Sequence, residues 1–206
     1  MPTYVSPSYE ILTPLYPKEI LKSIERAGRT CYKSEDKITD DSAVKFVQNL
    51  IKRKHFAMLE HYSFSVLFTI DRGVSHEIVR HRICSFAQES TRFCDYGGKG
   101  VVLIHPPGLT DAQRERREIH FWNTQTLYDA ERNEGILPEI ARGVLPTCLK
   151  TEIVVTANLR EWRHIFELRA IGTTGKPHPQ MKEVMLPLLT DLQIILPEVF
   201  GDLKIV

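Results

Sequence analysis

Residues 61–70 read HYSFSVLFTI, and this segment is the strongest indicator of secondary structure in the chain. Large apolar side chains occupy every second position, at Tyr62, Phe64, Val66, Phe68 and Ile70. A period of two is typical of a strand that buries one face of a sheet. We therefore expect a β-strand at His61–Ile70, with these five side chains directed toward the core.

The elements expected on either side of this strand mix strands and helices. Further strands are expected at Tyr9–Leu15, Val101–His105 and Thr151–Ala157. One expected helix begins near Thr39 and Asp40, which can cap it, and runs to Lys54. Other helices are expected at Lys18–Ala27, Asp111–Asn133, Pro138–Val144, Arg160–Ile171 and Pro179–Leu196. The last of these is expected to be interrupted at Pro187. A short helix capped by Ser75 is expected to carry Arg80, His81 and Arg82. Because no regular β-α-β alternation is visible, we predict an α+β fold with a mixed or antiparallel sheet packed with helices.

Size and composition indicate one ordinary globular domain covering residues 1–206. Apolar residues make up 42% of the chain and charged residues 26%, which is usual for a soluble protein. Apolar stretches such as Val184–Leu189 are too short to span a bilayer, and the N-terminus lacks the pattern of a secretion signal. We therefore expect a cytoplasmic protein that does not associate with a membrane.

The charge pattern favours a small anionic ligand over a nucleic acid. The formal net charge is +1, whereas a general nucleic-acid binder usually carries a larger basic excess. Cations are nevertheless concentrated locally, in Arg72–Arg92 and Arg160–His178. We therefore expect no nucleic-acid partner.

Several motifs that suggest other chemistry do not fit on inspection. His76 and His81 are five residues apart, whereas a zinc-protease helix needs a separation of four, so no metal site is expected. Gly97–Gly100 lacks the spacing of a phosphate-binding loop and is interpreted as a tight turn between strands. Cysteines occur at Cys31, Cys84, Cys94 and Cys148 without a CxxC pair, so reduced thiols are expected. Cys148 has no adjacent histidine and is interpreted as a core thiol.

The triplet Arg80, His81 and Arg82 is the most unusual cluster. If the preceding helix continues through it, Arg82 falls on the apolar side between Ile78 and Val79. A cation there is costly unless an anion meets it, and a phosphate matches a guanidinium well. The other interpretation is an exposed helix end that carries several cations. The residues alone leave both open.

Arg169 poses a similar question. In a continuous helix it lies in the middle of the apolar face formed by Trp162, Ile165 and Phe166, while Arg160 and His164 share another face. Either the helix ends early and Arg169 extends into solvent, or Arg169 is a cation positioned in a ligand pocket. Both interpretations remain open.

Arg80-His81-Arg82, separated by seven residues from Ser90, resembles the RHR-x7-S motif of the flavin-dependent thymidylate synthases. The resemblance extends along most of the chain. Other segments similar to that family are Ala27–Tyr32, His55 with Leu59–His61, Ala141–Pro146, Asn158–Arg160, Leu168–Ala170 and His178–Gln180.

The resemblance implies an activity: reductive methylation of dUMP to dTMP, with 5,10-methylenetetrahydrofolate as carbon donor. FAD would pass on hydride from NADPH, and no protein nucleophile would be needed. The resemblance also implies a homotetramer whose active sites are formed between subunits.

The resemblance also implies residue roles. FAD would be bound by Cys31, His55, Glu60, Arg80, His81, Arg82, Asn158, Arg160, His164 and His178, with His55 where folate or nicotinamide approaches. The nucleotide dUMP would be bound by Glu77, Arg80, Gln88, Ser90, Arg92, Arg142 and Arg169. Arg169 would be catalytic, holding the uracil and stabilising its enolate-like charge. Ala87, Gln88 and His164 depart from forms found in some members of the family.

Two other functions remain as alternatives. A flavin-dependent oxidoreductase with another nucleotide substrate would share the cofactor site but not the reaction. A nucleotide- or RNA-binding module could use the two cationic segments, although the net charge near zero weighs against it.

Overall fold

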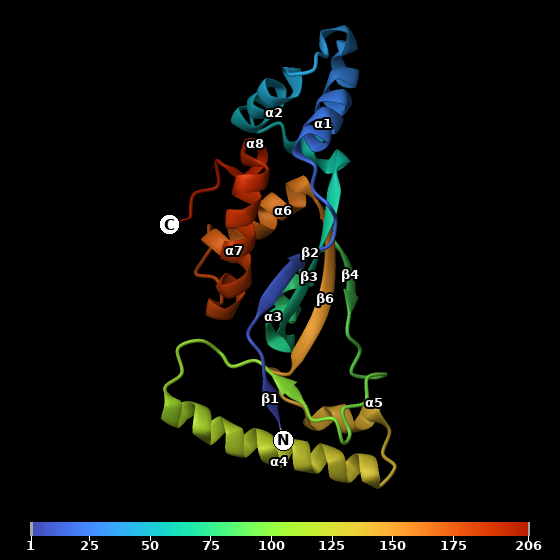
Figure 1. Cartoon of the computed structure of the whole chain (residues 1–206), viewed down its shortest axis with the longest axis vertical. Helices are drawn as coiled ribbons and strands as arrows, with labels where there is room; N and C mark the ends of the chain where they lie inside the picture. Colours follow the sequence, from blue (N-terminus) through green and yellow to red (C-terminus); the bar gives the residue numbers. More distant parts are fainter. Residues whose placement is uncertain (1, 206) are drawn as a thin grey trace. The chain divides into compact units, whose positions relative to one another are not determined.

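The computed structural model describes residues 2–205, and they form two compact units (Figure 1). The first unit comprises residues 2–8, 68–80 and 86–154, and the second comprises residues 9–67, 81–85 and 155–205. Helices and strands are mixed in the chain, which confirms the expected α+β class. The assignment of residues 1–206 to a single domain stays a prediction.

The strands form two sheets. An antiparallel sheet has the order β2 (Ser8–Ile11), β3 (Ser63–Asp71), β6 (Lys150–Asn158) and β4 (Ser85–Gln88). A short parallel sheet pairs β1 (Thr3–Tyr4) with β5 (Val102–Leu103).

The strand that the alternation pattern predicted is β3. It begins two residues later than expected and ends one residue later, and its residues Phe64, Val66, Phe68 and Ile70 are buried. The predicted strand Thr151–Ala157 is β6, which is one residue longer at each end. In both strands the alternation of apolar residues became alternation of burial, as the pleat requires.

The helical elements of the first unit are α3 (Arg72–Ile78), α4 (Asp111–Asn133), α5 (Pro138–Ala141) and the 3-10 turn η3 (Arg142–Val144). The helix α4 has the predicted bounds, and its start is fixed by a reciprocal capping box between Thr110 and Gln113. The predicted helix Pro138–Val144 is confirmed as α5 followed by η3.

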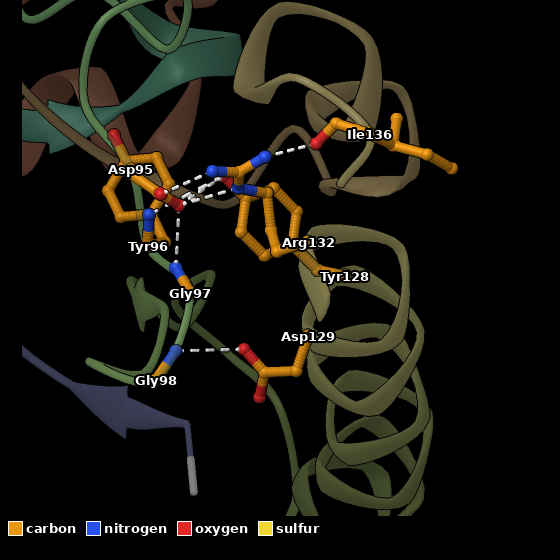
Figure 2. A network of polar contacts seen from close by, with 8 residues as sticks. All are labelled: Asp95, Tyr96, Gly97, Gly98, Tyr128, Asp129, Arg132 and Ile136. Carbon is orange, nitrogen blue, oxygen red and sulfur yellow. Dashed lines mark hydrogen bonds and ion pairs between the residues drawn. The ribbon is translucent and has the colours of Figure 1, made fainter. Parts of the chain in front are cut away.

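A network around Asp95 attaches the glycine-rich loop to α4 (Figure 2). The Asp95 carboxylate accepts hydrogen bonds from Nε and Nη2 of Arg132, at 3.1 and 2.8 Å, and from the backbone N–H of Gly97 at 2.9 Å. The N–H of Gly98 donates to Asp129 at 3.1 Å. These bonds hold the Asp95 pKa at about 2, chiefly through the side-chain bond from Arg132.

The expectation of a tight turn between strands at Gly97–Gly100 is therefore only partly right. The segment does turn, but it lies inside the long connection from β4 to β5 and forms no hairpin. The hydrogen bonds to α4 hold the glycine-rich segment in place, so the segment is ordered without pairing to a strand.

A small apolar cluster stabilises the first unit. It contains Val101, Leu103, Phe121, Cys148 and Leu149. Burial raises the pKa of the Cys148 thiol to about 11, which confirms its interpretation as a core residue. The other three cysteines are also free thiols in the structure.

The second unit contains the other helical elements of residues 2–205. These are α1 (Pro17–Tyr32), η1 (Glu35–Lys37), α2 (Ser42–Lys52), η2 (Phe56–His61), α6 (Leu159–Phe166), η4 (Glu167–Ile171), α7 (Pro179–Ile195) and α8 (Pro197–Phe200). The helices α1 and α2 lie side by side (Figure 1).

Several predicted boundaries are wrong. The strands β2 and β5 are shorter than expected, α1 extends five residues further, and β1, β4, η1, η2 and α8 were not predicted. The helix α2 begins at Ser42, because the Ser42 hydroxyl bonds to the backbone of Thr39 and leaves Thr39 and Asp40 outside the helix.

The interruption expected at Pro187 is also wrong, because α7 continues through it. A proline removes one backbone hydrogen bond. Four residues that flank it, Val184, Met185, Leu188 and Leu189, are fully buried, and their packing outweighs that loss.

The helix expected to carry Arg80, His81 and Arg82 ends before them. Asp71, not Ser75, caps α3 by accepting the N–H of Val74 at 2.7 Å, so the helix starts at Arg72 and ends at Ile78. The triplet lies in the turns that follow, and Arg82 is exposed and not on an apolar helix face. The buried member is His81, with 5% exposure.

The predicted helix Arg160–Ile171 changes its winding in the middle. The α-helical part ends at Phe166, and Glu167–Ile171 form a π-helical turn in which the N–H of Gly172 donates to the carbonyl of Glu167 at 2.9 Å. The turn therefore contains one residue more than an α-helical turn. Ala170, with 1% exposure, takes the buried position that a continuous α-helix would give to Arg169.

The interpretation that this helix ends early is therefore wrong, because helical winding continues to Ile171. Gly172 ends the turn in the left-handed region, with φ of 85°, and an added Cβ there would lie 2.6 Å from the carbonyl of Gly175. A glycine is thus required at this position.

Within residues 2–205, no helix is both long and apolar enough to cross a membrane.

Candidate functional site

Three side chains from distant segments meet in the second unit. His81 Nδ1 lies 3.1 Å from Oε1 of Glu161, and Nε of Arg169 donates a hydrogen bond to His81 Nε2 at 3.2 Å. An arginine Nε–H can only donate, so His81 Nε2 must be the acceptor. The ring hydrogen of a neutral His81 therefore sits on Nδ1 and is donated to Glu161.

The His81 ring is neutral at ordinary pH. Burial, together with the neighbouring charges of Arg169 and His164, lowers its pKa to about 4. The contact with Glu161 is therefore a hydrogen bond and not an ion pair, although its length would suit either. Burial raises the pKa of Glu161, while His164 and Arg160 oppose that rise.

A pocket of about 460 Å³ opens beside this group. It is lined by Phe56, Glu60, Ile83, Asn158, Arg160, Glu161, Arg163, His164 and Glu167. Four of the residues predicted to bind FAD are among them. Arg160 and His164 both face this pocket, as their shared helical face predicted.

The polar residues of this pocket are already ordered by the fold. Arg160 pairs with Glu60 at 2.6 Å, and the Asn158 side-chain oxygen caps α6 by accepting the N–H of Glu161 at 2.9 Å. The Asn158 amide nitrogen is the end of that side chain that can donate to a ligand. The rings of His81 and His164 lie edge to face, with centroids 5.7 Å apart.

A second pocket, of about 380 Å³, adjoins the first, since Phe56 and Arg160 line both. Cys31 and His55, two more predicted FAD residues, line this second pocket together with Gly28, Phe46 and Lys54. His178 lies at the start of α7, where its Nδ1 accepts the N–H of Gln180 at 3.3 Å.

The residues of the first pocket fit a flavin. An isoalloxazine has a flat apolar body and a polar edge, and a dinucleotide adds phosphates. Phe56 and Ile83 supply apolar surface, and Arg160, His164 and Asn158 supply donors.

In the first unit, the structure gathers three residues predicted to bind dUMP around one turn. The Ser90 hydroxyl accepts the N–H of Arg92 at 3.3 Å, and Arg142 donates to the neighbouring Thr91 hydroxyl at 3.2 Å. The Arg92 guanidinium pairs with Glu139 at 2.6 Å. Two arginines and a hydroxyl gathered around one turn are a suitable donor set for a phosphate monoester.

The other predicted substrate residues of this unit are less concentrated. The Gln88 amide donates to the hydroxyls of Ser75 at 2.8 Å and Thr151 at 3.2 Å, so its nitrogen serves the internal structure. Glu77 lies near the end of α3, and Arg80 is exposed just beyond it.

The two predicted sets thus fall mainly in different units. The FAD residues other than Arg80 belong to the second unit, and the dUMP residues other than Arg169 belong to the first. Among residues 2–205, no group of three or more His, Cys, Asp or Glu side chains is placed to hold a metal ion.

Sequence reasoning missed Glu161, which is 7% exposed and bonded to His81. Its sequence pattern explains why. Asn158 followed three residues later by Glu161 is typical of a helix start, so the glutamate reads as part of a cap. A partner 80 residues away leaves no local signal.

Comparison with known proteins gives a consistent result. A sequence model of the family described as "Thymidylate synthase complementing protein" matches residues 15–198. The flavin-dependent thymidylate synthase of Corynebacterium glutamicum is 33% identical over 203 residues, covering 88% of this chain and 79% of that protein. The enzyme of the same name from Geobacter sulfurreducens is 31% identical over 190 residues, covering 87% and 80%.

A solved structure shares the fold. The UMP/dUMP methylase PolB from Streptomyces cacaoi, crystallised with 5-Br dUMP, superposes with a TM-score of 0.80 at 21% identity, covering 97% of this chain and 95% of that one. The match of the family model and the identity to these relatives confirm the resemblance noted in the sequence. The chain belongs to the thymidylate synthase complementing protein family, that of the flavin-dependent thymidylate synthases.

Proposed function

We propose that this protein methylates dUMP to dTMP, with FAD as cofactor and with 5,10-methylenetetrahydrofolate and NADPH as co-substrates. The names of its relatives and the dUMP analogue in the structure of similar fold support this substrate and this cofactor. We also propose a cytoplasmic homotetramer with active sites formed between subunits, as the family resemblance implies.

The hydrogen bond between Arg169 and His81 is the observation that carries the proposal. Methylation at C5 of a uracil requires that carbon to become nucleophilic, which places negative charge on the ring oxygens. A positioned cation stabilises such charge. The neutral His81 ring fixes the guanidinium of Arg169 through its Nε, so the cation is oriented before substrate arrives.

The remaining site residues have binding roles in this proposal. Ser90, Arg92 and Arg142 hold the phosphate of dUMP, with Glu77, Arg80 and Gln88 as further contacts. Glu60, Asn158, Arg160 and His164 hold the flavin, together with Cys31, His55, Arg80, His81, Arg82 and His178. The flavin, when bound, supplies the hydride for the final reduction.

The environment of two cysteines supports a reaction without a protein nucleophile. Burial raises the pKa of Cys84 to about 12, and the charge of Glu161 adds to the effect. Cys148 has a pKa of about 11. Neither thiol is ionised near neutral pH, and the thiolate is the nucleophilic form.

The test is release of tritium from dUMP labelled at C5, measured after the flavin has been removed and again after FAD is restored. The reaction contains methylenetetrahydrofolate and either NADPH or NADH. We expect release only with FAD, methylenetetrahydrofolate and a reduced nicotinamide together. A folded protein that takes up FAD, releases no tritium and fails to bind dUMP would instead be a flavin-dependent oxidoreductase with another substrate.

A further inference from the structure

We propose that Glu161 is a positioning residue for the reaction: it fixes the tautomer of His81, and His81 in turn orients Arg169. The inference rests on the proposed role of Arg169 and adds Glu161 to the residues that the reaction requires. No part of the family resemblance points to Glu161.

The position of the Glu161 carboxylate is fixed from two sides. Its backbone N–H is bonded to the Asn158 side chain in the first turn of α6, at 2.9 Å. Its side chain is buried, and Oε1 lies 3.1 Å from His81 Nδ1. A hydrogen bond between two buried and anchored groups has a single geometry.

The donor and acceptor properties of the three groups then determine the ring hydrogen. An ionised carboxylate only accepts, and an arginine Nε–H only donates. The His81 ring satisfies both neighbours only when Nδ1 carries the hydrogen and Nε2 carries the lone pair. The hydrogen bond at one ring nitrogen thus sets the state of the other.

Removal of the carboxylate would release this constraint. The ring could then place its hydrogen on Nε2, where it would face the N–H of Arg169, and two donors would meet at 3.2 Å. Arg169 would have to move away. The predicted effect is on the orientation of the cation, while the π-helical turn remains.

The presence of a carboxylate at position 161, and not an apolar side chain, favours a positioning role for Glu161 over a role in packing alone. Burial of an ionised carboxylate is costly, and an apolar side chain would fill the same space at lower cost. Burial raises the pKa of Glu161, and His164 and Arg160 oppose that rise.

The first experiment compares Glu161→Ala and Glu161→Gln with Glu25→Ala. Glu25 is also a fully buried carboxylate, bonded directly to Arg29 at 2.9 Å, and it lines neither pocket. We expect Glu161→Ala to lower kcat roughly ten- to a hundredfold, the equivalent of one hydrogen bond to a charged group, with FAD still bound. Glu161→Gln should restore part of the rate, because its amide oxygen can still accept from Nδ1.

The control Glu25→Ala should lower thermal stability and leave kcat close to that of the wild type. If Glu161→Ala and Glu25→Ala reduce stability alike and neither changes kcat, Glu161 is only structural and the proposal is overturned.

A double substitution shows whether Glu161 acts through Arg169. If it does, Glu161→Ala combined with Arg169→Ala should turn over no more slowly than Arg169→Ala alone, because the oriented group is already absent. If the loss of kcat in the double variant equals the product of the losses in the two single variants, the proposal is overturned.

A measurement without substrate separates this inference from the proposed function. The protein is labelled at the nitrogens of its eight histidines, and the His81 signals are identified by their loss in His81→Gln. Nitrogen NMR at neutral pH should show a neutral His81 ring with hydrogen on Nδ1, and Glu161→Ala should change that state. Hydrogen on Nε2 in the wild type would overturn the proposal, whatever reaction the protein catalyses. An active Arg169→Ala variant with the Nδ1 tautomer intact would instead overturn the proposed role of Arg169.

Discussion

Nε of Arg169 donates to Nε2 of His81 across 3.2 Å, although the two residues are 88 positions apart in the chain. This bond joins His81 to the π-helical turn that carries Arg169, and both lie in the second unit. It gives the buried histidine a role that its sequence neighbours did not suggest.

Replacement of Arg169 by alanine should lower kcat about a hundredfold or more, because one positioned cation is lost from the charge-stabilising site. Tritium release at saturating dUMP measures the effect, and absorbance of bound flavin verifies the fold. Arg26→Ala, on the exposed side of α1, is a control that should retain full activity. Normal turnover by a folded, flavin-loaded Arg169→Ala protein would contradict the proposed role.

The stability of the protein should fall between about pH 6.5 and pH 4 because of His81. Its folded-state pKa is about 4, below the ordinary histidine value of 6.5, so the unfolded chain binds a proton in this range while the folded chain does not. The free energy of unfolding therefore decreases as pH falls, by about 3 kcal/mol at most from this group. Urea unfolding at pH 7 and pH 5 measures it.

His81→Asn, which has no ring to titrate, is the comparison for that experiment. Its free energy of unfolding should depend less on pH than that of the wild type over the same range. Equal pH dependence in the two proteins would show that folding does not lower the pKa of His81 and would contradict this prediction.

Replacement of Arg132 by alanine should destabilise the first unit modestly, through loss of the two hydrogen bonds that its guanidinium donates to Asp95. Asp95 has a lowered pKa, so its contribution is present above its unfolded pKa and is lost as pH falls toward about 2. Arg116→Ala, on an exposed face of the same helix, is the matched control. Equal thermal unfolding of the two variants would refute a stabilising role for this network.

Replacement of Arg82 by alanine should weaken FAD binding about tenfold, as expected for loss of one charge-assisted contact. Arg82 is exposed, so the thermal stability of the flavin-free protein should not change. Quenching of flavin fluorescence on titration measures the affinity. An unchanged affinity would remove Arg82 from the flavin site.

The parts of the fold with strong local signals could be predicted from sequence. The alternation in residues 61–70 predicted β3, and the polar helix Asp111–Asn133 was found with its bounds. In both cases the signal lies within the element itself, as periodicity or as a cap.

The features that place the site could not be predicted in this way. The end of α3 at Ile78 depends on Asp71 capping the helix four residues earlier than the expected cap, Ser75. The orientation of Arg169 depends on a π-helical turn. Because that turn contains one extra residue, a prediction based on the α-helical period of 3.6 assigns the buried position to the wrong residue. Glu161 acquires its role only through a residue 80 positions away.

The π-helical turn has a consequence for how this segment tolerates insertions and deletions. Deletion of one residue within Glu167–Ile171 would allow α-helical winding to continue from Leu159, and the side chains after the deletion would keep their packing. The residues before it, including Trp162 and Phe166, would stay in place. Loss of a single codon here would therefore redirect the arginine and leave the core unchanged. Catalytic competence and foldability could thus evolve separately in this segment.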